Sequence, residues 1–78
     1  MTNLEKYREI FVESLEVDDC KLEELHYQGT REWDSVGHMT LIAALEDAFN
    51  IMMDTDDIID FSSFEKGKEI LRKYDVEI

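Results

Sequence analysis

The 78-residue chain contains no proline, three glycines and one cysteine. With Cys20 as the only cysteine, there is no internal disulfide and no cysteine-rich metal site. A chain this short holds a single domain, 1–78, with a modest core and no room to enclose a deep active site. These limits favour a module that presents a chemical group over an enzyme that surrounds a substrate.

Basic residues are also scarce: 8 Lys and Arg stand against 20 Asp and Glu, and the net charge is -12. None of the basic residues falls between Arg31 and Lys66. Such a surface repels nucleic acid and anionic membranes, and it attracts protein partners with basic patches. No apolar run approaches membrane-spanning length, and the first residues lack the pattern of a signal peptide. We therefore expect a cytoplasmic protein that binds no nucleic acid and inserts stably into no membrane.

The first 34 residues predict one helix followed by a long connection. Thr2 and Glu5 have capping-box spacing, and the helix that begins there is expected to end near Leu15. The inner face of this helix is predicted to carry Leu4, Tyr7, Ile10, Phe11 and Leu15. The connection has few apolar anchors, which are Leu22, Leu25 and Tyr27. A short helical turn is expected around Leu22 to Leu25, because long connections in small domains often contain one.

The second helix is predicted to begin at Asp34 or Ser35, both good N-cap residues, and to end near Phe49, before Asn50. A step of about 100° per residue places two apolar stripes on this helix. The first stripe can pack into a core and comprises Leu41, Ile42, Leu45 and Phe49. The second stripe comprises Val36, Met39 and Ala43, with Thr40, Glu46 and Asp47 beside it. It is either additional core or an exposed surface on which a basic partner docks.

Two further helices complete the prediction. A short third helix is expected over 54–60, capped by Asp54 or Thr55. The fourth is expected to begin at Ser62 or Ser63, and Ser62 and Glu65 again have capping-box spacing. Its predicted inner face comprises Phe64, Gly67, Ile70, Leu71 and Tyr74. No alternating strand pattern competes, so we expect an all-α fold: a four-helix bundle with a long first loop and a short third helix.

Ser35 stands where a loop meets a helix N-terminus, and this position allows two roles. The serine is either a helix cap or the bearer of a phosphate ester, which the free N–H groups and the helix dipole would stabilise. A catalytic triad of Ser35, His38 and Asp34 is disfavoured, because all three lie on one short segment without a Gly-x-Ser-x-Gly pattern. His26 is expected to pack or to face solvent.

The acidic run from Asp54 to Asp57 is not an EF-hand, since Ile59 stands where that loop requires glycine. We expect a helix start with a solvated acidic face, and no metal site.

Asp34-Ser35-Val36-Gly37, with the apolar and acidic residues up to Phe49, resembles the Asp-Ser-Leu/Val/Met motif and second helix of the acyl carrier proteins. The resemblance extends without gaps to the fourth helix and more loosely over the first. It implies a bundle of acyl-carrier-protein type with a 4'-phosphopantetheine arm attached covalently to Ser35, beside Asp34. The thiol of this arm carries acyl or aminoacyl groups as thioesters. The partner-binding residues that the resemblance implies are Val36, Met39, Ala43, Glu46 and Asp47.

The resemblance also implies a set of partners. These are a phosphopantetheinyl transferase and the enzymes that load or accept acyl or aminoacyl groups through basic patches; the carrier itself is monomeric and performs no catalysis. Gly37, Thr40 and Ala48 stand where fatty-acid carriers usually have acidic residues, and Met53-Asp54 replaces the usual Ile-Pro. With Trp33 before the motif, the chain resembles specialised stand-alone carriers, including D-alanyl carrier proteins and those of polysaccharide or secondary-metabolite clusters. A specialised pathway is therefore expected; the competing class is an acidic helical interaction module without the arm.

Overall fold

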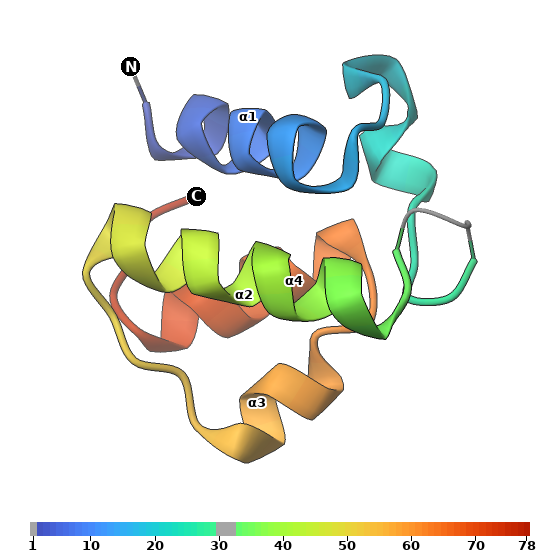
Figure 1. Ribbon diagram of the computed structural model, residues 1–78. Helices are drawn as coiled ribbons and strands as arrows, with labels where there is room; N and C mark the ends of the chain where they lie inside the picture. The colour runs from blue at the N-terminus through green and yellow to red at the C-terminus, as the bar shows by residue number, and fades with distance from the viewer. Residues whose placement is uncertain (1, 30–32) are drawn as a thin grey trace.

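The computed structural model describes residues 2–29 and 33–78, and in these residues the fold is all-α (Figure 1). The α-helices are α1 (Asn3–Leu15), α2 (Ser35–Phe49), α3 (Thr55–Asp60) and α4 (Phe64–Lys73). A 3-10 helix, η1 (Asp19–Glu24), lies in the first connection, where a short helical turn is predicted. Across the described ranges, no helix is both long enough and apolar enough to cross a membrane.

The ends of α1 and α2 follow local side-chain chemistry. The hydroxyl of Thr2 accepts the N–H of Glu5 at 3.1 Å, and the carboxylate of Glu5 accepts the N–H of Thr2 at 3.2 Å. This confirms the predicted capping box. Each helix ends at a residue in the left-handed region, Glu16 after α1 (φ 55°) and Asn50 after α2 (φ 54°). Both predicted ends are confirmed.

Of the two predicted starts of α4, Ser62 and Ser63, the structure has Ser63 as the N-cap. The Ser63 hydroxyl, not that of Ser62, accepts the N–H of Lys66 at 2.9 Å, so the predicted capping box of Ser62 and Glu65 is wrong. The reason lies in the first connection, which contacts this turn. The carbonyl of Ser62 accepts the N–H of Tyr27 at 2.7 Å, and Ser63 forms an isolated antiparallel bridge with His26. These contacts turn Ser63 rather than Ser62 toward the first turn of α4.

Aromatic rings fill the interior. Five aromatic side chains have no exposed surface, and they are Tyr7, Phe11, Trp33, Phe61 and Phe64. The Phe11 ring contacts those of Trp33 and Phe64 edge-on, with centroids 5.4 and 5.0 Å away. The hydroxyl of Tyr7 donates to the Phe64 carbonyl at 2.6 Å, which joins α1 to α4. In the described residues, the buried hydrophobic side chains of α1, η1, α2 and α4 belong to one cluster, and Ile58 of α3 packs against it.

The long first connection is held against this core. Leu22 and Leu25 are buried, as predicted. The carbonyl of Leu25 also accepts the N–H of Phe64 at 3.3 Å. Together with the contacts of Tyr27 and His26, this bond fixes the connection against the turn between α3 and α4. The connection therefore places Tyr27 beside the N-terminal end of α2.

Candidate functional site

Ser35 is exposed and is the first residue of α2, which has 15 residues. Asp34 provides the helix cap, because its Oδ1 accepts the N–H of Gly37 at 2.8 Å. Of the two predicted N-cap candidates, Asp34 therefore takes this role. The Ser35 hydroxyl instead lies 3.2 Å from the hydroxyl of Tyr27. The site thus holds an accessible hydroxyl at the positive end of a long helix.

Tyr27 reaches Ser35 from the first connection. Its ring contacts those of His38 and Trp33, with centroids 4.9 and 6.4 Å away. With its N–H bonded to Ser62, the tyrosine is fixed at both its backbone and its ring. The sequence predicts Tyr27 only as an apolar anchor. No local pattern indicates its contact with Ser35, since that contact depends on the path of an irregular loop.

His38 is buried, with 8% of its surface exposed, and both of its ring nitrogens have partners. The indole N–H of Trp33 donates to Nδ1 at 3.0 Å, so Nδ1 is an acceptor and the ring proton belongs on Nε2. Nε2 then donates to the carbonyl of Ile58, 2.8 Å away in α3. With His38 held by Trp33 and Ile58, and Asp34 held by Gly37, the disfavoured triad does not form.

The second apolar stripe of α2 lies on the surface. Val36 is 76% exposed, Met39 is 59% exposed, and Ala43 is also exposed. The first stripe packs as predicted: Leu41, Ile42 and Leu45 are buried and Phe49 is half-buried. The second stripe is therefore exposed and is not additional core, while docking of a basic partner on it stays a prediction.

The two acidic residues beside this stripe differ in their surroundings. Asp47 is exposed and available to a partner. Glu46 is half-buried, and its carboxylate accepts the N–H of Met53 at 2.9 Å, which fixes the loop between α2 and α3. Glu46 therefore has a structural contact that the sequence does not indicate.

An apolar groove of about 380 Å³ runs between α2 and α3 beside Ser35. Its lining comprises Tyr27, Ser35, His38, Met39, Ile58 and Ile59. Ile59 is 71% exposed, so α3 adds an apolar side chain to the surface formed by Val36 and Met39. No pattern in the sequence indicates that Ile59 lies on the surface.

The exposure of Ile59 follows from the way α3 is anchored. Asp57 is buried, and its carboxylate accepts hydrogen bonds from the Lys73 ammonium at 2.6 Å and from the Tyr74 hydroxyl. These donors hold the pKa of Asp57 below its ordinary value, the Lys73 bond contributing most. Asp54 and Asp56 are exposed, as predicted for an acidic face, but Asp57 contradicts that prediction because α4 supplies it with a cation.

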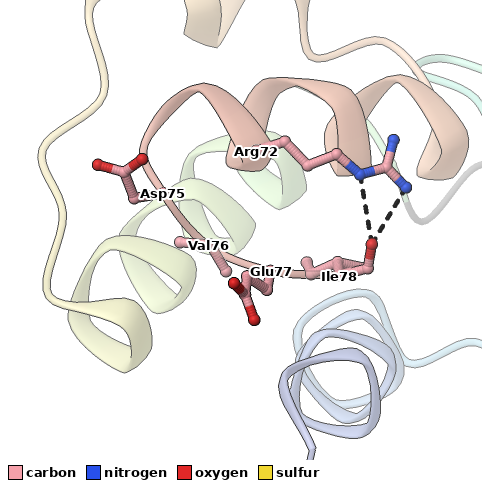
Figure 2. Close-up of a pocket in the computed structure, with 5 residues that line it drawn as sticks. All are labelled: Arg72, Asp75, Val76, Glu77 and Ile78. Carbon is pink, nitrogen blue, oxygen red and sulfur yellow. Dashed lines mark hydrogen bonds between the residues drawn. The ribbon is translucent and has the colours of Figure 1, made fainter.

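A second hollow lies at the C-terminal end of α4 (Figure 2). It has a volume of about 510 Å³ and is lined by Arg72, Asp75, Val76, Glu77 and Ile78. Its only cation is occupied, because Nε and Nη2 of Arg72 donate to the Ile78 carbonyl at 3.3 and 3.1 Å. Over residues 2–29 and 33–78, no three His, Cys, Asp or Glu side chains gather into a metal-ligating cluster. The surroundings of Ser35 are therefore the strongest candidate site.

No family model and no curated protein matches the chain. We therefore infer function from the geometry around Ser35. In residues 2–29 and 33–78, that geometry combines an exposed serine, a helix N-terminus and an apolar surface. The side chains of Asp34 and His38 are both held by other hydrogen-bond partners.

Proposed function

We propose that the chain is a stand-alone acyl carrier protein, a four-helix bundle that carries acyl or aminoacyl groups as thioesters on a 4'-phosphopantetheine arm attached to Ser35. One observation carries the proposal: Ser35 begins α2 with an exposed hydroxyl, while Asp34 alone provides the cap. When attached, the arm supplies the terminal thiol that holds the acyl group. The chain supplies the attachment point and a surface for partner enzymes.

The surroundings of Ser35 fit a phosphodiester. The N–H groups of a first helical turn have no acceptor within the helix, and the dipole of α2 favours negative charge there. Because Asp34 already accepts the Gly37 N–H, esterification of Ser35 removes no capping bond. Loss of a cap would otherwise cost about 1 kcal/mol. Modification is therefore compatible with the folded helix.

The surface beside Ser35 fits a basic partner. Val36, Met39 and Ile59 provide exposed apolar anchors, and Asp47 lies among the neighbouring acidic residues. No lysine or arginine occurs between Arg31 and Lys66. A transferase or acyl-transfer enzyme with a basic patch would be attracted by charge and would then bury the anchors. The departures from the fatty-acid carriers favour a specialised pathway.

The test is enzymatic modification of the purified protein with coenzyme A and a broad-specificity phosphopantetheinyl transferase. The Ser35 oxygen forms a bond to phosphorus, the pyrophosphate bond of coenzyme A breaks, adenosine bisphosphate leaves, and the serine proton passes to a base of the transferase. Intact mass spectrometry is expected to show a gain of one arm, and Ser35→Ala is expected to abolish it.

Ser63→Ala is the matched control, because it removes a serine at another helix start, where the hydroxyl does serve as a cap. This variant should lose about 1 kcal/mol of stability and still gain one arm. Absence of any gain in the wild-type protein would instead favour the acidic interaction module, which binds basic partners without an arm.

A further inference from the structure

The side chain of His38 lies between the groove beside Ser35 and the aromatic core. It lines the groove, yet it is 8% exposed. On its inner side its ring is stacked on that of Trp33, with centroids 6.1 Å apart, and it meets the Phe61 ring edge-on at 6.2 Å. Trp33 and Phe61 are fully buried. A group that moved from the groove toward the core would therefore meet His38 first and closely packed aromatic rings behind it.

The histidine also joins the two walls of the groove. Its own backbone belongs to α2, and its Nε2 donates to the Ile58 carbonyl of α3 at 2.8 Å. Ile58 lies in the last turn of α3, where carbonyl groups have no partner within the helix, so the histidine supplies that partner. Its Nδ1 accepts the Trp33 indole N–H at 3.0 Å. Displacing the ring would break both of these hydrogen bonds, at a cost in free energy.

We infer that His38 closes the passage between α2 and α3, so that the cargo stays at the surface and the carrier is suited to short acyl or aminoacyl groups. This inference rests on the proposed function. A long alkyl chain could pass from the groove into the core only by separating α2 from α3 and breaking both bonds of His38. A short group gains little from burial and needs no such opening. His38 is therefore a specificity-determining residue, and it acts by keeping the interior closed.

The experiment compares acetyl, butyryl and octanoyl thioesters on the full chain. Each is loaded with the corresponding acyl-coenzyme A and the transferase, and intact mass confirms loading. Wild-type octanoyl and acetyl forms are expected to melt within about 2 °C of each other. Hydroxylamine should cleave their thioesters at rates that differ by less than about twofold. Trp33 is the only tryptophan, so its indole N–H gives one cross-peak in a proton–nitrogen spectrum, and that peak should not move with chain length.

Two variants test the role of His38. His38→Ala removes both hydrogen bonds and opens space, so its octanoyl form should melt at least about 4 °C above its acetyl form. Its octanoyl thioester should also resist hydroxylamine by at least about fivefold. His38→Gln keeps an acceptor for Trp33 and a donor for Ile58, and it should behave like the wild type.

Two results would overturn the inference. One is protection of the octanoyl thioester in the wild type, together with movement of the Trp33 peak. The other is an octanoyl effect that is the same in His38→Ala and His38→Gln. The wild-type series decides the matter even if the alanine variant does not fold. Failure of the proposed function has a different signature, since no arm would be added to any protein in the series.

Discussion

Three side chains near Ser35, those of Tyr27, Asp34 and His38, each bond to a different partner. Asp34 accepts the Gly37 N–H, and His38 bonds to Trp33 and Ile58, so neither competes for the serine. Among the described residues, it is Tyr27 that contacts the serine oxygen, at 3.2 Å. The serine hydroxyl is thereby held in one orientation while the residue stays exposed.

Replacement of Tyr27 by phenylalanine tests this orientation. Tyr27→Phe keeps the ring against Trp33 and His38 but removes the contact with Ser35. We expect the rate of Ser35 modification to fall by about two- to tenfold, the equivalent of one hydrogen bond of about 0.5–1.5 kcal/mol. The measurement is the initial rate of mass gain at fixed coenzyme A and transferase.

Tyr7→Phe is the matched control for this substitution. The Tyr7 hydroxyl donates to the Phe64 carbonyl at 2.6 Å, in the contact between α1 and α4, so its loss should lower stability without changing the modification rate. Equal rates for wild type and Tyr27→Phe would show that the tyrosine hydroxyl does not orient the serine.

The sequence predicts the residues of the site that belong to α2, and it misses those that approach from elsewhere. Asp34 and Ser35 are identifiable because capping is a local property of adjacent residues. The contacts of Tyr27 with Ser35 and of His38 with Ile58 join separate elements. Neither contact leaves a periodic signal, since each depends on how the loops bring those elements together.

At the scale of elements, α3 has six residues and depends on its neighbours for its position. Asp57 joins it to Lys73 and Tyr74, while the carbonyl of Ile58 joins it to His38 in α2. A helix this short is not stable alone. Its orientation, and with it the exposure of Ile59, therefore depends on these polar contacts.

The Asp57 contact makes stability depend on pH. Since its pKa is lowered in the fold, its contribution is complete above the ordinary value of 3.8 and is lost as the pH falls through the lowered value. We expect Asp57→Asn to melt several degrees below the wild type at about pH 7, and the difference to shrink below about pH 4. Thermal melts followed by circular dichroism measure both effects.

The exposed neighbour Asp56 provides the control for this experiment. Asp56→Asn removes the same charge from the same helix without touching Lys73 or Tyr74. Its melting temperature should stay close to that of the wild type across the range. If the difference in melting temperature between Asp57→Asn and the wild type did not change with pH, the assigned role of the ionised Asp57 carboxylate would be wrong.

The exposed stripe of α2 can be tested independently of α3. Met39→Glu places a charge on the proposed docking surface, where Met39 is 59% exposed. We expect kcat/KM for the transferase to fall about tenfold, since the partner would have to bury that charge, while the helical signal in circular dichroism stays unchanged.

Met52→Glu is the matched substitution, because Met52 is 85% exposed but lies in the loop after α2. It should leave kcat/KM near the wild-type value. Equal losses in the two variants would indicate a general effect of added charge, and loss of helical signal in Met39→Glu would place Met39 in the core.

Helix boundaries are the best-predicted property of the elements. Caps and apolar spacing place α1, α2 and α4 within a residue or so, because both are encoded within a few neighbouring positions. The faces of α3 are predicted only in part. The sequence predicts an outward Asp57, but Lys73 at the end of α4 and Tyr74 after it bind this carboxylate, which is buried. Hydrophobicity alone could not indicate that the Asp57 carboxylate would be buried and would pair with Lys73.

At the scale of the whole molecule, charge is distributed unevenly. The net charge is -12, and the segment from Arg31 to Lys66, which includes α2 and α3, has no basic residue between those two positions. The proposed docking surface therefore lies in the most acidic part of the chain. Such a field raises the rate at which a basic partner arrives more than it raises final affinity.

Salt should therefore slow association. Raising sodium chloride from about 20 to about 200 mM is expected to lower the association rate constant with a basic transferase by about tenfold, because the Debye length shortens. Stopped-flow fluorescence of Trp33 can follow the reaction. Asp47→Asn should weaken the salt dependence slightly, and an association rate that did not respond to salt would contradict steering by charge.

The bond between the Tyr27 N–H and the Ser62 carbonyl has a consequence for the order of events during synthesis. Ser35 leaves the ribosome well before Ser62, so an incomplete chain has the serine but not the turn that fixes its tyrosine. Closing this long loop becomes favourable only once α4 can pack against α1. The surroundings of Ser35 are thus completed only after Ser62 has been added, and under the proposed function a transferase that recognises them would distinguish folded chains from those still being made.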